Sequence, residues 1–305
     1  MIDAGQCECF SEAMQSLDDL CQIATRHAGS NAVPHLAIHK LDQPTELAPL
    51  IYEPCVCLIL QGAKRTFIGG KELNYAAGSC LVVAAELSAM GQVHQASPGQ
   101  PFLALALTID PIRLSDAWPT MPDSTDGFEE SFALQRASDV LIETWRRMLH
   151  LYDRPHEIAA LAELHERELL FRLLSGPMGP LLRQIGSADS NLARIRRCMD
   201  HIRQHHAERI EVASMAALAG MSLTTFHRRF KNVTGASPLQ YQKQVRLHEA
   251  KRMLVASQGS AASVAYQVGY ESASQFSREY RRLFGMPPLQ DAAAARELAK
   301  MVVGY

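Results

Sequence analysis

The spacing of hydrophobic residues changes twice along this chain of 305 residues. Residues 1–30 carry apolar side chains at helical spacing. Between residues 35 and 109 the period becomes two, and short apolar runs are separated by glycine and proline. After Pro111 the helical period returns. The pattern therefore predicts one helix, then a group of short strands, then helices.

The strand-like part has about seven runs, which is typical of a small antiparallel barrel or sandwich. The runs are HLAIHKL, CVCLIL, KRTFIG, KELNYA, SCLVVAA, GQVHQA and FLALALTI. Two helical runs follow, SDVLIETWRRMLHLYD and HEIAALAELHERELLFRLL, and each has one apolar stripe, so we expect them to pack together. Their other apolar residues belong either to an ordinary surface of the domain or to a dimer seam. We expect a homodimer.

Composition and charge narrow the class of protein. Apolar residues make up 47% of the chain and charged residues 20%, as in globular proteins, and no apolar run approaches the length of a membrane span. The first residues lack the basic and apolar regions of a secretory signal, so we expect a cytoplasmic protein without membrane partners. Residues 191–290 contain 15 Lys and Arg against 6 Asp and Glu, a net charge of +9, whereas residues 1–190 contain 13 against 24, a net charge of −11. A basic domain attracts phosphate backbones, although an ordinary solvated surface can have the same charge.

The basic part of the chain contains an internal repeat with an offset of fifty residues. The offset pairs Ser222 with Ser272, Phe226 with Phe276, Arg228 with Arg278, Phe230 with Tyr280, Gly235 with Gly285 and Pro238 with Pro288, and an offset of forty-nine pairs Ala216 with Ala265 and Gly220 with Gly269. Each copy is predicted to form two short helices, the first ended by glycine and the second capped by serine. Two helix-turn-helix units are therefore expected, at about 209–232 and 259–282, with a long spacer helix that begins near Pro238.

The outward side of each second helix carries side chains that suit double-stranded DNA. The candidate base contacts are Thr224, His227 and Arg228 in the first unit and Ala273, Ser274, Ser277 and Arg278 in the second, and the candidate phosphate contacts are Lys231, Arg281 and Arg282. Arginine can bind guanine through two hydrogen bonds, serine and threonine can bond base edges, and alanine can touch the thymine methyl group. Any single side chain here could be an ordinary surface residue, but the duplicated arrangement predicts binding in adjacent major grooves.

These residues resemble the AraC/XylS family of bacterial transcription regulators. The run VAYQVGYESASQFSREYRRLFGMPP is similar to the signature of the family's second unit, and RLHEAKRML resembles its linker helix around Arg246. The runs IYEPCVCLILQGAKRTFIGG, YAAGSCLVV and GQVHQASPGQPFLALALTIDP resemble the N-terminal arm of one subgroup. The resemblance implies a cupin-like β-barrel followed by dimerising helices, and a ligand-responsive regulator, an activator that recruits RNA polymerase. It also places the family's base-facing positions on the seven candidates above.

The resemblance and the pattern together predict an α+β chain, in which a cupin-like β-barrel with flanking helices precedes an all-α domain. The expected parts are an N-terminal helix at 1–30, an effector-binding and dimerisation domain at 31–178, a linker at 179–190, a DNA-binding domain at 191–290 and a C-terminal tail at 291–305.

Cysteines are the candidate sensing residues. The chain has seven, without CxxC pairs or zinc-binding spacing, which fits free thiols in a reducing compartment. Cys55 and Cys57 are two apart on a predicted strand, so their thiols point to one face, and Cys80 lies on another strand that could neighbour it. The three are either small buried hydrophobic residues or thiols that meet an electrophile or oxidant. Related regulators of the subgroup are associated with aldehyde-reductase operons, which makes reactive carbonyl compounds candidate effectors.

Two other functions remain open at this stage. One is a metal-independent cupin enzyme with a DNA-binding tail, and the other is an architectural protein that binds DNA without sequence preference. The chain lacks the HxH pair, following Glu and later His of metal-binding cupins, and it has no phosphate loop or nucleophile elbow. We therefore expect neither a metal nor a cofactor, and no enzymatic activity.

Overall fold

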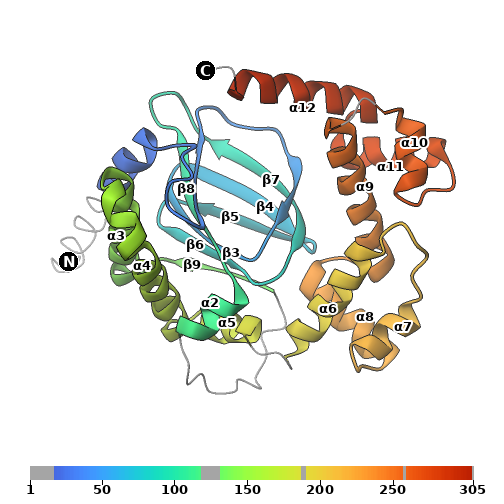
Figure 1. The fold of residues 1–305 in the computed structure, drawn as a ribbon, viewed down its shortest axis with the longest axis horizontal. Helices are drawn as coiled ribbons and strands as arrows, with labels where there is room; N and C mark the ends of the chain where they lie inside the picture. The colour runs from blue at the N-terminus through green and yellow to red at the C-terminus, as the bar shows by residue number, and fades with distance from the viewer. Residues whose placement is uncertain (1–16, 118–130, 187–189, 257–258, 304–305) are drawn as a thin grey trace, which may run out of the picture. The chain divides into compact units, whose positions relative to one another are not determined.

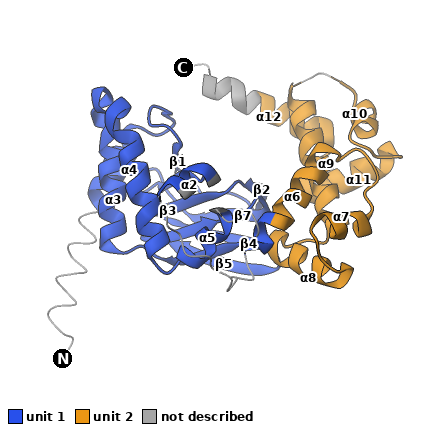
Figure 2. Cartoon of the chain, turned by 60° about the horizontal axis from the view of Figure 1, so that its bottom comes forward, with its two compact units in different colours: residues 1–193 blue, residues 194–305 orange. Residues whose placement is uncertain are grey.

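The computed structural model describes residues 17–117, 131–186, 190–256 and 259–303 (Figure 1). The chain forms two compact units, residues 1–193 and residues 194–305 (Figure 2). Within the described residues, no helix is both long enough and apolar enough to cross a membrane.

Unit 1 is built around antiparallel strands in two sheets, of five and of four strands within the described residues. The strands are β1 Leu36–Leu41, β2 Ala48–Tyr52, β3 Cys55–Gln61, β4 Ala63–Ile68, β5 Lys71–Ala76, β6 Ser79–Val83, β7 Leu87–Gln95, β8 Phe102–Thr108 and β9 Phe132–Arg136. The five-stranded sheet has the order β1-β8-β3-β6-β9, and the four-stranded sheet has the order β2-β7-β4-β5. One buried cluster takes residues from both sheets, such as Ile59 on β3 and Ile68 on β4, so a hydrophobic core lies between the sheets.

The predicted strands are present, but the sequence pattern missed β2 and β9. Both are edge strands of their sheets. An edge strand packs against one neighbour only and tolerates residues that a central strand excludes, such as Pro49 in β2. Its sequence signal is therefore weak, whereas the central strand β3 is almost continuously apolar.

Helices cover the outer face of the five-stranded sheet. They are a helix over residues 17–26, α2 Pro111–Ala117, α3 Asp139–Leu149, the short 3-10 helix η1 His150–Asp153, α4 Pro155–Ser175 and α5 Gly179–Gly186. Leu17, Leu20 and Ile23 are buried, and the Sγ of Cys21 lies 3.6 Å from the carbonyl oxygen of Leu60 on β3. Apolar side chains on alternate positions of one strand thus face either the helices or the second sheet.

Two segments differ from the expected organisation. Residues 179–190 were expected to be a linker, but α5 occupies Gly179–Gly186, because Leu181, Leu182 and Ile185 form a buried apolar stripe. Residues 291–305 were expected to be a tail, but α12 extends over Pro288–Val303. In the first segment the buried stripe outweighs the glycines of the sequence, and in the second Ala292 is buried in the core around Phe276 and Tyr280.

Unit 2 is helical throughout its regular structure. Its helices are α6 Asn191–Gln204, which begins just before the unit boundary, α7 Val212–Leu218, α8 Leu223–Thr234, α9 Pro238–Ala256, α10 Ala261–Gln267, α11 Ala273–Phe284 and α12. The fold class of a β-rich unit followed by a helical unit with helix-turn-helix pairs is confirmed. The predicted caps are also confirmed: the hydroxyl of Ser222 accepts from the N–H of Thr225, and that of Ser272 accepts from the N–H of Gln275.

Candidate nucleic-acid interface

Helix α8 presents one exposed face with polar and basic side chains. Thr224, His227, Arg228 and Lys231 are all exposed, and they follow the spacing i, i+3, i+4, i+7 that places residues on one side of a helix. The opposite side is anchored in the core by Phe226 and Phe230, whose ring centroids lie 5.4 Å apart. The packing of the aromatic side therefore forces the polar side outward.

Helix α11 repeats this arrangement with some differences. Ser274, Arg278, Arg281 and Arg282 are exposed, and Ser277 is half-buried. Ala273 is also half-buried and packs against the core of this unit. Of the four predicted base contacts on α11, Ser274 and Arg278 are the most accessible.

The hydroxyl of Ser274 already has a local partner. It lies 2.8 Å from the hydroxyl of Ser272, the residue that caps α11. A hydroxyl can donate one hydrogen bond and accept two, so Ser274 can bond the cap and still bond a base or a phosphate. The contact also fixes the rotamer of Ser274 beside the N-terminus of the helix.

Arg246 on α9 links the two helix-turn-helix units. Its guanidinium donates hydrogen bonds to the carbonyl oxygens of His206 (2.6 Å), Ala207 (3.2 Å) and Glu208 (2.9 Å), which precede the first unit, and of Gly269 (2.7 Å) in the turn of the second. Five N–H donors in one planar group make this arrangement possible, and a lysine could not reproduce it. Arg246 therefore positions the two helix-turn-helix units of unit 2 relative to each other.

A second polar group, Glu279, fixes α11 against α9. Its carboxylate accepts hydrogen bonds from Lys243 (3.0 Å), Tyr270 (3.0 Å) and Gln275 (3.1 Å). Partial burial opposes ionisation, but these three donors hold the pKa of Glu279 below its ordinary value. Glu279 was not among the residues expected from the sequence, although a single negative charge within the basic run SREYRR marks its position.

A separate polar cluster lies among the apolar side chains between the two sheets of unit 1. The hydroxyl of Tyr75 lies 3.0 Å from that of Tyr52 and 2.8 Å from that of Thr66, and the ammonium of Lys64 donates to the hydroxyl of Tyr52 at 3.0 Å. Burial raises the pKa of Tyr52 to about 12, so both tyrosines are neutral and donate or accept as hydroxyl groups. This cluster was not expected from the sequence, because its members come from three different strands.

Two of the predicted sensing cysteines border the same interior. The Sγ atoms of Cys55 and Cys57 lie 3.7 Å apart, as the same-face prediction requires. A hydrogen bond from Cys55 and the nearby charge of Lys64 lower the pKa of the Cys57 thiol, although burial opposes this, and the same contact raises the pKa of Cys55. The two thiols therefore share one contact, and the charge of Lys64 favours the ionised form of Cys57.

Cys80 does not join this pair. Strand β6 does pair with β3, but Cys80 lies opposite Leu58, whereas Cys57 lies opposite Leu81. A shift of one position in a strand reverses the face, so Cys80 points away from the core between the sheets. It is fully buried, and burial raises the pKa of its thiol. The strand of Cys80 thus neighbours that of Cys55 and Cys57, as expected, but the register places its thiol on the other face of the sheet.

Comparison with known families covers both units. The family described as AraC-type transcriptional regulator N-terminus matches residues 32–181, and a helix-turn-helix domain family matches residues 215–293. The chain belongs to the AraC family. The HTH-type transcriptional activator RhaS of Salmonella schwarzengrund and that of Salmonella typhimurium are each 29% identical over 171 residues, which cover 55% of this chain. The match spans 59% of the length of these AraC-family relatives.

The fold is also that of a solved AraC-like structure. The crystal structure of unsaturated fatty acid-bound ToxT from Vibrio cholerae aligns with a TM-score of 0.56 and 10% sequence identity, over 84% of this chain and 94% of ToxT. At this identity the likeness concerns the fold alone. It covers the β-rich part and the helical part together.

Proposed function

We propose that this AraC-family chain is a sequence-specific, DNA-binding transcription regulator that activates its target promoter. The observation that carries the proposal is the duplicated face: α8 and α11 each expose hydrogen-bonding and basic side chains at matching positions, fifty residues apart. Arg228 and Arg278 are the side chains suited to guanine, and Lys231, Arg281 and Arg282 are suited to phosphates. RNA polymerase is the further partner that an activator of this family requires.

Selection from random DNA tests this proposal. The full chain is incubated with a library of random duplexes at physiological salt, and the enriched duplex is then competed against a scrambled one. A specific regulator should prefer the enriched duplex by a factor of about 10³ or more. No enrichment, or equal competition by scrambled DNA, would contradict the proposal and favour an architectural protein.

We further propose that unit 1 binds a small organic effector between its two sheets. The polar cluster of Tyr52, Lys64, Thr66 and Tyr75 supplies hydrogen-bond donors and one positive charge inside an otherwise apolar interior. ToxT, which has the same fold, binds an unsaturated fatty acid in its crystal structure. A few polar groups among apolar walls are what a small-molecule site needs.

A reactive carbonyl compound is the effector class that the thiol pair suits. With an α,β-unsaturated aldehyde, the sulfur of Cys57 forms a bond to the β-carbon, the C=C electrons move to the α-carbon, and the thiol proton ends there, so no oxidant is needed. If Cys55 and Cys57 are instead inert buried residues, neither thiol should form this adduct.

Limited treatment with 2-propenal separates the two cases. Peptide mass spectrometry of the full chain should find the adduct first at Cys57, and Cys57→Ser should remove it. Cys80→Ser is the matched control and should change nothing, because Cys80 is fully buried on the other face. Equal or greater labelling of Cys80 would contradict the assignment.

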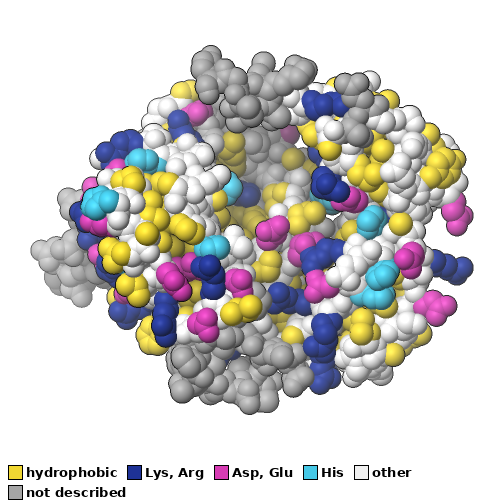
Figure 3. All heavy atoms as spheres, viewed as in Figure 1, with side chains coloured by type: hydrophobic (Ala, Val, Ile, Leu, Met, Phe, Trp, Pro, Cys, Tyr) yellow, Lys and Arg dark blue, Asp and Glu magenta, His cyan; other side chains and the backbone are white. Residues whose placement is uncertain are grey.

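We also propose that α4 contributes the surface of a homodimer. Leu164 is 58% exposed and Phe171 is 43% exposed, and with the exposed Ala160 and Arg167 they follow alternating spacings of four and three residues. Residues at that spacing lie on one side of a helix, so Leu164 and Phe171 expose apolar surface on the same side, with Arg167 between them. Figure 3 shows hydrophobic side chains gathered with charged ones over the side of unit 1 that carries α3 and α4.

The mass of the particle in solution tests this seam. Light scattering after size exclusion should give a dimer for the wild type and a monomer for the variant Leu164→Glu with Phe171→Glu. Val140→Glu, at an exposed apolar position on α3 (53% exposed), is the control and should remain a dimer. A monomeric wild type would refute the dimer.

A further inference from the structure

Helices α3 and α4 border a cavity of about 340 Å³ that is half open to solvent and whose lining differs from the interior between the sheets. Its walls come from α3, from η1 and from the first half of α4. The lining residues are Glu143, Arg146, Arg147, His150, Leu151, Arg154, Glu157, Leu161 and His165. A cavity of this volume can enclose a small organic molecule.

The side chains around this cavity are predominantly cationic. Three arginines and two histidines face two glutamates, which gives a net charge of +1 with neutral histidines. Glu143 is fully engaged, since it accepts from Arg146 at 2.7 Å and from Arg147 at 3.1 Å. Among the described residues the guanidinium of Arg154 has one ion pair, a long one of 3.6 Å with Glu157. Because Arg146 pairs with Glu143 and Arg147 pairs with Glu143 and Glu168, Arg154 is the least compensated cation at the cavity.

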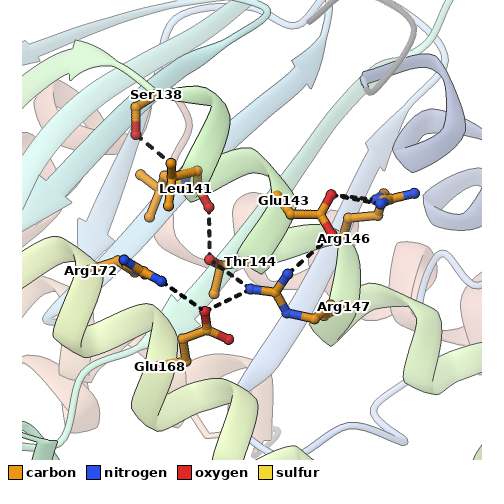
Figure 4. A network of polar contacts seen from close by, with 9 residues as sticks. Ser138, Leu141, Glu143, Thr144, Arg146, Arg147, Glu168 and Arg172 are labelled. Carbon is orange, nitrogen blue, oxygen red and sulfur yellow. Dashed lines mark hydrogen bonds and ion pairs between the residues drawn. The ribbon is translucent and has the colours of Figure 1, made fainter. Parts of the chain in front are cut away.

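A network of ion pairs fixes one wall of the cavity (Figure 4). Arg147 on α3 donates to Glu143 on its own helix and to Glu168 on α4 at 2.7 Å, and Arg172 lies 3.6 Å from the same Glu168. Arg147 is therefore held in place by two carboxylates on different helices. Such preorganisation lowers the entropy cost of binding a ligand.

Both imidazoles at the cavity lack a hydrogen-bond or ion-pair partner among the described residues. His150 lies in η1 and His165 lies one turn beyond Leu161 on α4. Burial and the charge of Arg147 lower the pKa of His165, which favours the neutral imidazole, and a neutral imidazole has one N–H to donate. Leu151 and Leu161 add an apolar surface beside these donors.

We propose that this cavity is a second ligand site of unit 1 and binds a small organic anion with two or more acidic groups. Arg154, Arg146 and the two imidazoles donate to the acidic groups, and Leu151 and Leu161 contact the carbon skeleton. The site is independent of the proposed effector site between the sheets, because none of its lining residues belongs to that core.

Calorimetric titration of the full chain with citrate, at constant ionic strength, tests the site. The wild type should bind one citrate per chain with a dissociation constant of about 1 mM or lower. Arg154→Gln should raise the dissociation constant by about tenfold, because it removes a charged hydrogen-bond donor, and His165→Gln by about threefold. Glu157→Gln should lower it, because it removes a negative charge from the wall. Inorganic phosphate should bind at least about tenfold more weakly than citrate, because it has no carbon skeleton to contact the leucines.

Two control variants locate the binding. Arg172→Gln removes an arginine of the same ion-pair network that does not line the cavity, and it should change the dissociation constant by less than about twofold. Lys64→Met removes the cation between the sheets and should have no effect. The proposal is overturned if no saturable binding occurs, if Arg154→Gln binds like the wild type, if phosphate binds as tightly as citrate, or if Lys64→Met abolishes binding.

Discussion

The first helix-turn-helix unit, α7 and α8, and the second, α10 and α11, have the same local pattern but are held differently. In both, an aromatic pair anchors the second helix, with ring centroids 5.4 Å apart for Phe226 and Phe230 and 5.5 Å apart for Phe276 and Tyr280. In both, a glycine in the left-handed region ends the second helix, at Gly235 and at Gly285. The repeat therefore specifies the helices, the turn and the exposed face.

The two helix-turn-helix units differ in the side-chain hydrogen bonds that hold their second helix. In the second, the hydroxyl of Tyr280 donates to Asp291 on α12 at 2.7 Å, and Glu279 bonds α9 and the turn before α11. The equivalent positions of the first unit are Phe230 and Arg229, which cannot make these bonds. The second unit is thus fixed by more directional contacts, which is consistent with its closer match to the family signature. We expect the first unit, with its own Thr224 and His227, to decide operator choice.

Substitution of the turn glycines should give the largest difference in stability between the two helix-turn-helix units. Gly220 and Gly269 are equivalent, with φ of 62° and 87°. A Cβ at Gly269 would overlap the backbone of Ala207, whereas a Cβ at Gly220 would meet only the flexible end of Arg194 at 3.5 Å. Gly269→Ala should lower the stability of unit 2 by about 3 kcal/mol, from backbone strain and overlap together, and Gly220→Ala by about 1 kcal/mol. Hydrogen exchange of amides in α8 and α11 measures both, and equal losses would contradict this difference.

A substitution at Arg246 tests whether the two helix-turn-helix units bind DNA as one rigid body. Arg246→Lys keeps the charge but loses most of the bonds to four carbonyl oxygens, so unit 2 should lose about 2 kcal/mol of stability. Binding to DNA with both half-sites should weaken more than binding to one half-site. Arg252→Lys is the control on the same helix, because Arg252 is 72% exposed and pairs only with the adjacent Glu249 in the described structure. An equal effect on both DNA lengths would mean that Arg246 is merely structural.

Alanine substitutions compare the DNA-binding contributions of the exposed faces of α8 and α11. Arg228→Ala and Arg278→Ala should each weaken binding to the selected duplex by about 1 to 3 kcal/mol and relax base preference at one position. Lys231→Ala should weaken binding to all sequences by a similar factor, with a smaller salt dependence. Binding titrations on selected and scrambled DNA at two salt concentrations measure this. If the arginine variants lose equally on both duplexes, these residues contact phosphates instead of bases.

The smallest expected effect concerns His248 on α9, whose imidazole packs against Phe284 of α11 with ring centroids 5.2 Å apart. Burial, and then the charge of Lys251, lowers the pKa of His248 to about 4. Above pH 6.5 the imidazole is neutral in both the folded and unfolded chain. As the pH falls from 6.5 toward 4 the unfolded chain takes up the proton first, so folding is destabilised. Hydrogen exchange in α11 should show a loss of about 0.7 kcal/mol between pH 7 and pH 6 that His248→Gln removes. An unchanged loss in that variant would exclude His248.

Much of the helical unit could be predicted from the sequence. Serine caps, glycine stops and the aromatic pair act within one or two helical turns, so Ser222, Phe226 and Gly235 alone predict α8 and its outward side. Which strand residues of unit 1 share a face could also be predicted from local spacing, since Cys55 and Cys57 are two residues apart and lie on one face. The exposure of Ala273 was not predictable, because the side of α11 that packs inward also depends on neighbouring helices.

What the sequence by itself determined is therefore the set of elements, the duplication and the family. Only the tertiary structure decided which distant groups meet. Cys80 lies beside β3 but on the opposite face, because strand register is set by pairing between segments. Arg246 reaches carbonyl oxygens 23 to 40 residues away, and the cavity between α3 and α4 gathers side chains from two helices and the turn between them. Periodicity describes one segment at a time, whereas these sites arise from the packing of several segments.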